Sequence, residues 1–182
     1  MEKNNSIGNI RSQEEVAADI ARVTDPQKAL AVLEDLRARM EERYPSKNYK
    51  NLQTNLDASK GLMYQAAIAG TTVGVSTGVT HGKHFFAKLF FVDPKYSRSN
   101  VARGLIEAVK ADFDEISMTS FQFGDDTDAT SAKQSARQTA LNTFYRQHGF
   151  VPQYPEFEER SNLGGSTLRM IWKRGDAKAN HE

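Results

Sequence analysis

The most informative stretch of the chain spans residues 89–106 and reads Leu89-Phe90-Phe91-Val92-Asp93-Pro94-Lys95-Tyr96-Ser97-Arg98-Ser99-Asn100-Val101-Ala102-Arg103-Gly104-Leu105-Ile106. It begins as an apolar strand, continues as a short polar loop and ends in the first turns of an amphipathic helix. The first amide groups of a helix lack partners within the helix, and the helix dipole adds a partial positive charge at the same end. The stretch therefore predicts an anion site for a phosphate, with Arg98 or Arg103 at its edge. A strand–loop–helix unit that binds nothing is the alternative.

The segment before this stretch predicts an antiparallel meander of three strands. Residues 63–80 are rich in Val, Thr and Ala and poor in charge, and turn signals fall at residues 69–71 and 81–82. The third strand is expected over residues 83–92. Gly78 lies inside the second strand, where a glycine marks a bulge, a close backbone approach or a plain irregularity of the strand.

Two helices are predicted before the meander. The first follows a capping box formed by Ser12 and Glu15. Its apolar residues are Val16, Ile20 and Val23. Asp25-Pro26 then starts a second helix, whose apolar residues recur every three or four positions until Pro45. A short strand is expected at residues 7–11.

Helices and strands alternate after residue 100. Apolar residues four apart over 101–113 predict a helix, and alternation over 116–121 predicts a strand. The remaining expected elements are a polar loop over 124–128, a helix marked by Ala136, Ala140 and Phe144 and ended by Gly149, and a hairpin over 154–173 that turns at 162–165.

This order of elements predicts the α/β class, as an α+β layered domain. With 182 residues, the chain is expected to form a single domain over residues 7–173. Residues 1–6 and 174–182 offer no apolar face to bury, so they are expected to be flexible ends.

The composition excludes several classes of function. The chain has no cysteine, which removes disulfide scaffolds, thiolate metal sites and cysteine nucleophiles. Its formal net charge of +1 gives no reason to expect binding to nucleic acid. No apolar run reaches the roughly 18 residues that cross a membrane, and the first residues lack the apolar stretch of a signal peptide. We therefore expect a cytoplasmic protein that binds neither nucleic acid nor membrane.

A second informative segment spans residues 140–150 and reads Ala140-Leu141-Asn142-Thr143-Phe144-Tyr145-Arg146-Gln147-His148-Gly149-Phe150. Taken in this order, the two segments resemble the Gcn5-related N-acetyltransferase (GNAT) superfamily. Val92, Pro94 and Tyr96 match the V-x-P-x-Y strand signature of that family, and residues 144–150 match its later F/L-Y-x-x-x-G-F signature. The resemblance covers about residues 60–173 of the sequence. It implies a GNAT-like acyl-CoA N-acyltransferase fold, a mixed sheet of six to seven strands flanked by four helices.

The resemblance implies that acetyl-CoA binds as a co-substrate. Its pyrophosphate is expected on backbone N–H groups of the loop and helix start, and its pantetheine arm on the strand before them. The residues that correspond to the family's cofactor site are Phe90, Phe91, Val92, Ser97, Arg98, Ser99, Asn100, Val101, Ala102, Arg103 and Gln138. The loop departs from the family pattern, because Ser97 replaces an arginine and Asn100 replaces a glycine. Arg98 is the neighbouring residue that can supply the missing charge, and asparagine reaches left-handed conformations more easily than other non-glycine residues.

Tyr145 occupies the family position of the general acid. Its phenol, with an ordinary pKa of about 10, can donate a proton to a departing thiolate. A partly buried aromatic residue without a catalytic role is the alternative. Many relatives use a glutamate on the third meander strand as base, but residues 83–92 contain no acidic residue, and His84 is the only near-neutral titrating group there. His84, which shares a strand face with Phe90 by simple alternation, is either this base or an ordinary strand residue.

No metal site is expected. His81 and His84 are three residues apart, and in a continuous strand such residues point to opposite faces. The acceptor amine cannot be identified from the sequence. In the family it enters between the first two helices and the last hairpin, where Glu156, Glu158 and Glu159 could attract a cationic amine or form a solvated edge.

Two functions follow as alternatives. The first is an N-acetyltransferase that transfers an acetyl group from acetyl-CoA to an amine of a small molecule or a protein by direct attack. The second is a GNAT-fold protein that has lost catalysis and acts in binding, regulation or assembly, for instance in a phage or mobile element. The changed residues Ser97 and Asn100 and the missing strand glutamate motivate the second alternative. A homodimer remains open in either case.

Overall fold

The computed structural model describes residues 17–49, 52, 61–97, 99–120, 131–162 and 167–175. The strand expected at residues 7–11, the capping box at Ser12 and Glu15, the loop at 124–128 and Arg98 lie outside these residues. The described elements are β1 (Asp19–Val23), α1 (Pro26–Arg43), β2 (Gly61–Ile68), β3 (Thr71–His81), β4 (His84–Val92), a 3-10 turn (Pro94–Tyr96), α3 (Val101–Asp112), β5 (Glu115–Ser120), α4 (Ser131–Gln147), β6 (Val151–Pro152), a second 3-10 turn (Pro155–Phe157), α5 (Glu158–Asn162) and β7 (Leu168–Lys173).

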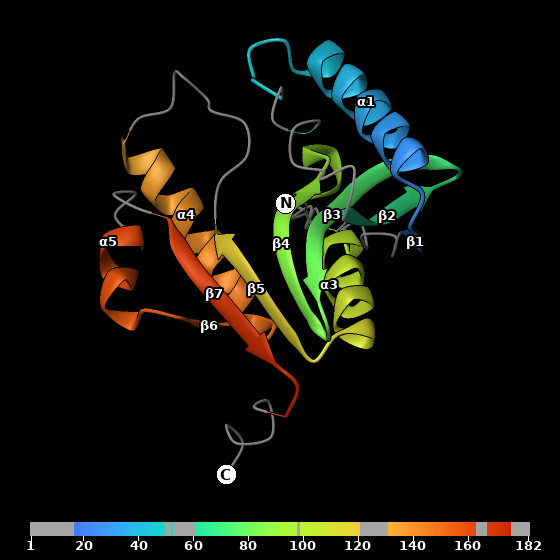
Figure 1. Cartoon of the computed structure of the whole chain (residues 1–182). Helices are drawn as coiled ribbons and strands as arrows, with labels where there is room; N and C mark the ends of the chain where they lie inside the picture. Colours follow the sequence, from blue (N-terminus) through green and yellow to red (C-terminus); the bar gives the residue numbers. More distant parts are fainter. Residues whose placement is uncertain are drawn as a thin grey trace, which may run out of the picture.

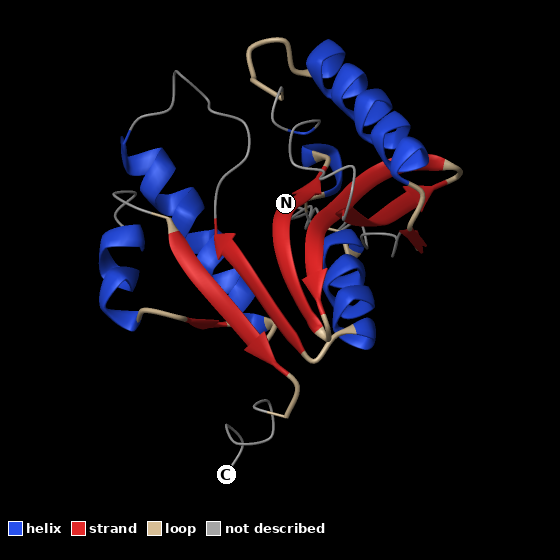
Figure 2. Cartoon of the chain, viewed as in Figure 1, coloured by secondary structure: helices blue, strands red, loops and turns tan. Residues whose placement is uncertain are grey.

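The seven strands form one mixed sheet with the order β1-β2-β3-β4-β5-β7-β6 (Figures 1 and 2). Neighbouring strands are antiparallel except β4 and β5, which are parallel. Helices cover both sides of this sheet, which confirms the predicted layered α/β class. No described helix is long and apolar enough to cross a membrane.

The predicted helix around Ile20 and Val23 is wrong, because these residues belong to strand β1. Their spacing of three also suits a strand that serves two cores. Ile20 packs against the core on one side of the sheet, whereas Val23 is buried in the core on the other side. Asp25 then caps α1 by accepting hydrogen bonds from the amides of Gln27 and Lys28, as the Asp25-Pro26 signal predicted.

The meander of β2, β3 and β4 is confirmed, with its turns at the predicted positions. Gly70 and Gly82 have positive φ in these turns. The pairing of β3 with β4 shifts by one residue between Thr77 and Gly78. Leu89 pairs with Thr77 and Ala87 with Gly78, so Lys88 is an extra residue in β4, a β-bulge.

Two cores lie on opposite sides of the sheet. We call them the α3 face, covered by α3 and α4, and the α1 face, covered by α1. Because of the bulge, Phe85 and Ala87 lie on the α3 face before Lys88, and Phe90 and Val92 lie on it afterwards. On the opposite side of β4, Leu89 and Phe91 pack in the core of the α1 face.

The C-terminal part differs from the predicted hairpin. Only its second arm is a strand, β7, and the first arm contains a 3-10 turn and the short helix α5. Pro155 at the start of the turn and Glu158 and Glu159 in the first turn of α5 are helix-start signals that the hairpin prediction overlooked. The predicted turn at residues 162–165 lies largely outside the described residues. Helix α3 is confirmed, and so are strand β5 and helix α4.

Candidate active site

Strands β4 and β5 separate inside the sheet. They pair at three positions, which are His84 with Glu115, Phe85 with Ile116 and Phe86 with Ser117. Beyond Phe86 and Ser117 the two strands diverge and form a V (Figure 1). Strand β4 still pairs with β3 as far as Val92, and β5 with β7 as far as Ser120. Among the described residues, the inner edge of β4 therefore has no strand partner past Phe86, and such an edge can pair with an extended ligand.

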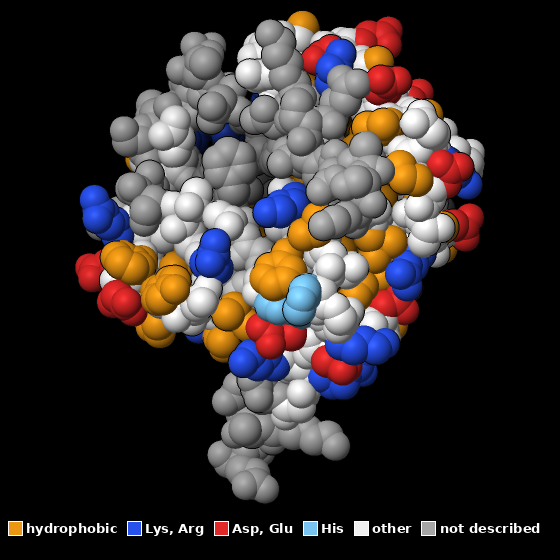
Figure 3. Space-filling view, viewed as in Figure 1, with side chains coloured by type: hydrophobic (Ala, Val, Ile, Leu, Met, Phe, Trp, Pro, Cys, Tyr) orange, Lys and Arg blue, Asp and Glu red, His pale blue; other side chains and the backbone are white. Residues whose placement is uncertain are grey.

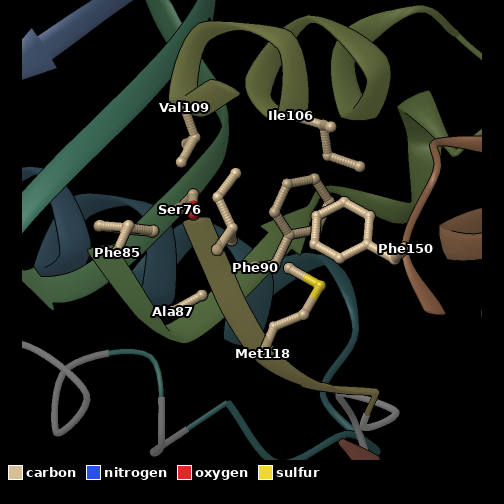
Figure 4. A pocket seen from close by; sticks show the side chains of 9 residues that line it. Ser76, Phe85, Ala87, Phe90, Ile106, Val109, Met118 and Phe150 are labelled. Atoms are coloured by element: carbon tan, nitrogen blue, oxygen red, sulfur yellow. The ribbon is translucent and has the colours of Figure 1, made fainter. Parts of the chain in front are cut away.

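A small apolar pocket lies between the V and helix α3 (Figure 4). Its lining residues are Ser76, Phe85, Ala87, Phe90, Ile106, Val109, Ile116, Met118 and Phe150. Its volume is about 10 Å³, which is room for roughly one water molecule. Side chains thus fill the α3 face of the V near its closed end, so a ligand between the strands must lie toward the open end.

The polar loop after β4 leads directly into α3 at the open end of the V. Ser99 shapes this entry, because its hydroxyl donates to the carbonyl of Tyr96 at 2.6 Å and accepts from the amide of Val101 at 3.3 Å. The first intrahelical bond joins the amide of Gly104 to the carbonyl of Asn100. The amides of Ala102 and Arg103 lie before that bond, in the first turn of α3, where N–H groups have no acceptor within the helix.

Ser97 and Asn100 are both exposed on the loop. Asn100 has φ −76°, so it does not use the left-handed conformation for which an asparagine was expected to replace glycine. The loop therefore closes in ordinary backbone conformations at Asn100, and the change from glycine introduces no strain there.

The three strand residues assigned to pantetheine lie at the open end of the V. Phe90 and Val92 point to the α3 face and Phe91 to the α1 face, so side chains of this segment are committed to both cores. The part of the segment that can face a ligand is its backbone edge.

Tyr145 lies on α4 and is buried, with 3% of its surface exposed. Its ring meets Phe90 edge to face at 6.1 Å between ring centroids and Phe150 at 5.8 Å. Burial raises the pKa of the Tyr145 phenol well above its ordinary value. The structure thus brings the predicted acid next to the strand predicted to hold the cofactor.

His84 does not share a face with Phe90, which corrects the sequence-based expectation. The bulge at Lys88 shifts the alternation by one residue, so His84 lies on the α1 face and Phe90 on the α3 face. Its Nε2 atom lies 2.8 Å from Ser117 Oγ and 3.5 Å from Glu115 Oε1, and its ring stacks on Phe86 at 3.8 Å. His84 and Phe90 are six positions apart in the sequence, roughly 20 Å along an extended strand.

The two histidines of the meander lie on one face, contrary to the expectation from a continuous strand. A turn at Gly82 makes His81 and His84 cross-strand partners. His84 also pairs with Glu115 in the next strand. The described residues nevertheless contain no group of three or more side chains that could hold a metal ion.

Gln138 is buried, and its side chain faces the interior of the protein. Its amide nitrogen donates to the Ser120 hydroxyl at 3.0 Å and to Asn142 Oδ1 at 3.0 Å. Asn142 in turn donates to Ser161 and Asn162 of α5. The buried side of α4 therefore carries Gln138, Asn142 and Tyr145, and the stripe of Ala136, Ala140 and Phe144 that marked this helix is largely exposed.

The acidic residues considered for the acceptor lie at the far edge of the sheet. Glu156 and Glu159 are exposed on the 3-10 turn and α5, and Glu158 pairs with Arg146. This region adjoins β6, with β7 and β5 between it and the V (Figure 1). Among the described strands, β5 and β7 therefore separate these carboxylates from the V.

Sequence reasoning missed Asp93 and Ser117, and it left a bulge at Gly78 as one of several interpretations without placing the extra residue at Lys88. Asp93 precedes a proline, and an Asp-Pro pair is a capping signal that was used at Asp25 but not here. Gly78 was the available signal for the bulge. A Cβ atom there would lie 2.4 Å from the carbonyl oxygen of Phe86 and 2.6 Å from the Phe85 ring.

Comparison with known proteins agrees with this geometry. Residues 59–152 match the family model described as "Acetyltransferase (GNAT) domain", and the chain belongs to this family. Its fold is similar to that of an acetyltransferase from Streptococcus agalactiae (16% identity, 86% of this chain and 98% of the other, TM-score 0.53). It is also similar to the fold of the ribosomal-protein-S18-alanine N-acetyltransferase of Escherichia coli (15% identity, 88% of this chain and 97% of the other, TM-score 0.53).

A third similar fold is that of the PaiA N-acetyltransferase from Thermoplasma acidophilum, whose structure contains coenzyme A (14% identity, 87% of this chain and 99% of the other, TM-score 0.51). Comparison with curated proteins gives no match. The similar structures confirm the expected GNAT fold, and the match to the family model covers both segments that suggested it.

Proposed function

We propose that the protein is an N-acetyltransferase that moves an acetyl group from acetyl-CoA to an amine. The observation that supports this most is the V between β4 and β5, which opens beside the start of α3 and next to Tyr145. The pantetheine arm would pair with the edge of β4 that diverges from β5, near Phe90, Phe91 and Val92. The pyrophosphate would accept hydrogen bonds from the amides of Ala102 and Arg103 at the positive end of α3.

In this proposal Tyr145 acts on the leaving thiolate. Because burial raises the pKa of its phenol, Tyr145 stays protonated at neutral pH and can always donate a hydrogen bond. The raised pKa also makes full proton transfer less favourable than it is for an exposed tyrosine. We therefore assign Tyr145 chiefly to stabilising the departing sulfur by hydrogen bonding.

His84 is the proposed base, and it would act through water. It lies on the α1 face, whereas Tyr145 lies on the α3 face. An incoming amine and a departing thiolate occupy different sides of the reacting carbonyl, so a base and an acid on opposite faces suit this reaction. Because His84 lies far along β4 from the open end of the V, a chain of several water molecules would have to carry the proton.

A family member without catalysis is the second candidate. Two observations favour it. Strand β4 carries no acidic residue, and His84 already has a hydrogen-bond partner in the hydroxyl of Ser117. This candidate differs from the first in a measurable way, because it predicts no turnover whether or not acetyl-CoA binds.

Calorimetry with acetyl-CoA tests the first step of the proposal. We expect saturable binding, a higher melting temperature with acetyl-CoA and release of free CoA when a mixed library of amines is added. Binding without CoA release from any amine would support the second candidate. No heat and no change in melting temperature at millimolar acetyl-CoA would remove the acetyltransferase proposal.

A further inference from the structure

Asp93 directly follows strand β4 and has a buried carboxylate. Only 1% of its surface is exposed, although it immediately precedes the polar loop. Its Oδ1 atom accepts a hydrogen bond from the amide of Lys95 at 2.9 Å and so caps the 3-10 turn over residues 94–96. Its own amide donates to the carbonyl of Val73 at 2.8 Å. Asp93 therefore fixes the direction in which the chain leaves the sheet toward α3.

The last residue of α1 pairs with this carboxylate. Arg43 Nη1 lies 2.5 Å from Asp93 Oδ2, and the pKa of the guanidinium is raised chiefly by the charge of Asp93. The hydroxyl of Tyr44 lies 3.5 Å from Asp93 Oδ1. A buried carboxylate needs such partners, because an unpaired charge away from water is strongly destabilising. Arg43 is thus the described cation that balances Asp93.

Aromatic contacts join the same end of α1 to β4. Tyr44 lies 6.4 Å from Tyr49 between ring centroids, and Tyr49 meets Phe91 edge to face at 5.8 Å. The pair of Arg43 and Asp93 is therefore part of a packed contact between the end of α1 and the last residues of β4, directly before the cofactor loop.

We propose that Asp93 is a positioning residue for acetyl-CoA and that Arg43 holds it in place, so that helix α1 is coupled to cofactor affinity. The inference rests on the proposed function, because it concerns the same loop. The ion pair sets the angle of the 3-10 turn and hence the placement of the amides at the start of α3. Small displacements of such donors weaken ligand binding strongly. By reciprocity, acetyl-CoA strengthens the attachment of α1 to the sheet.

The test compares acetyl-CoA binding by wild type, Arg43→Gln, Arg43→Lys and Asp93→Asn. The matched control is Arg22→Gln, which removes a similarly exposed arginine from its pair with Asp112 at the other end of α3. We expect Arg43→Gln and Asp93→Asn to raise the dissociation constant of acetyl-CoA about tenfold. Arg43→Lys, which keeps the charge, recovers most of this loss, and Arg22→Gln changes affinity less than twofold. Turnover at saturating acetyl-CoA stays within about twofold of wild type.

The outcomes separate this inference from the proposed function. Wild type that fails to bind acetyl-CoA contradicts the proposed function itself. If wild type binds and folded Arg43→Gln binds equally well, the positioning role is wrong. An equal loss in Arg22→Gln also overturns it, because a general loss of stability would then explain the effect. Should Asp93→Asn not fold, Arg43→Gln still decides the question, since the Arg43 side chain is 41% exposed.

Discussion

The ring of Tyr145 meets the ring of Phe90 edge to face at 6.1 Å between ring centroids, although the two residues are 55 positions apart in the sequence. This contact joins helix α4 to the open end of the V, where β4 has lost its β5 partner. His84 lies on the same strand as Phe90 but on the opposite face, because Lys88 is an extra residue between them. The two candidate catalytic side chains are thus divided by one bulge. Histidine side chains are visible, in pale blue, on the face of the molecule that Figure 3 presents.

Replacing Tyr145 with phenylalanine tests the acid. The ring contacts with Phe90 and Phe150 remain, so we expect the fold and the affinity for acetyl-CoA to change little. Turnover should fall about a hundredfold, because the hydrogen bond to the departing sulfur is lost. Steady-state kinetics with saturating acetyl-CoA measure this. Tyr154→Phe, at an exposed tyrosine on the far side of β7, is the control. Unchanged turnover in Tyr145→Phe would exclude the phenol from catalysis.

The pH dependence of turnover gives a second measure of Tyr145. Burial raises the pKa of this phenol, so the phenol loses its proton only at a pH well above the ordinary value of about 10. We expect no loss of activity from Tyr145 up to that pH. A decline in turnover between pH 8 and 9 that disappears in Tyr145→Phe would contradict the buried, protonated phenol.

His84→Gln tests the base. We expect kcat/KM to fall about a hundredfold at neutral pH if His84 relays the proton of the amine. His81→Gln is the matched control, since His81 is the exposed cross-strand neighbour of His84. Equal kinetics in both variants would make His84 an ordinary strand residue.

Local signals predicted most of the fold, and they failed where one pattern fits two structures. Ile20 and Val23 fit a helix stripe by spacing, yet in β1 the same spacing supplies one residue to each core. The bulge at Lys88 depends on how β3 and β4 pair, and simple alternation could not show it. The interior position of Gln138 also depends on partners from β5 and α4, which lie far from it in sequence or one helical turn away.

Gly78→Ala tests the close approach that accompanies the bulge. The added methyl group would lie 2.4 Å from the carbonyl oxygen of Phe86, and this backbone atom cannot move aside cheaply. We expect the free energy of unfolding to fall by about 2 kcal/mol. Gly104→Ala in α3 is the control, because its nearest neighbour is Ile20 at 3.4 Å, and alanine favours the helix by about 1 kcal/mol. In urea titrations, Gly78→Ala should unfold at a lower urea concentration than wild type, and Gly104→Ala at a higher one.

Asn142→Ala tests the polar cluster that joins α4, β5 and α5. The Asn142 amide accepts from Ser120 at 2.6 Å and donates to Asn162 at 2.7 Å. Removing this amide leaves the buried hydroxyls of Ser120 and Ser161 without it as a partner, so we expect the free energy of unfolding to fall by about 2 to 3 kcal/mol. Thr143→Ala, at the exposed neighbouring position, should cost far less. Equal losses in the two variants would show that the cluster contributes little.

His148 should make stability depend on pH. Burial lowers the pKa of His148 below 6.5, the charge of Lys110 and the weaker influence of Arg103 lower it further, and Glu107 partly opposes them. Between the folded pKa and 6.5 the unfolded chain binds more protons, so stability falls as pH decreases through this window. We expect the melting temperature of wild type to drop more between pH 7 and pH 5.5 than that of His148→Gln. His81→Gln should follow wild type, and a parallel decline of all three proteins would assign the pH dependence to other groups.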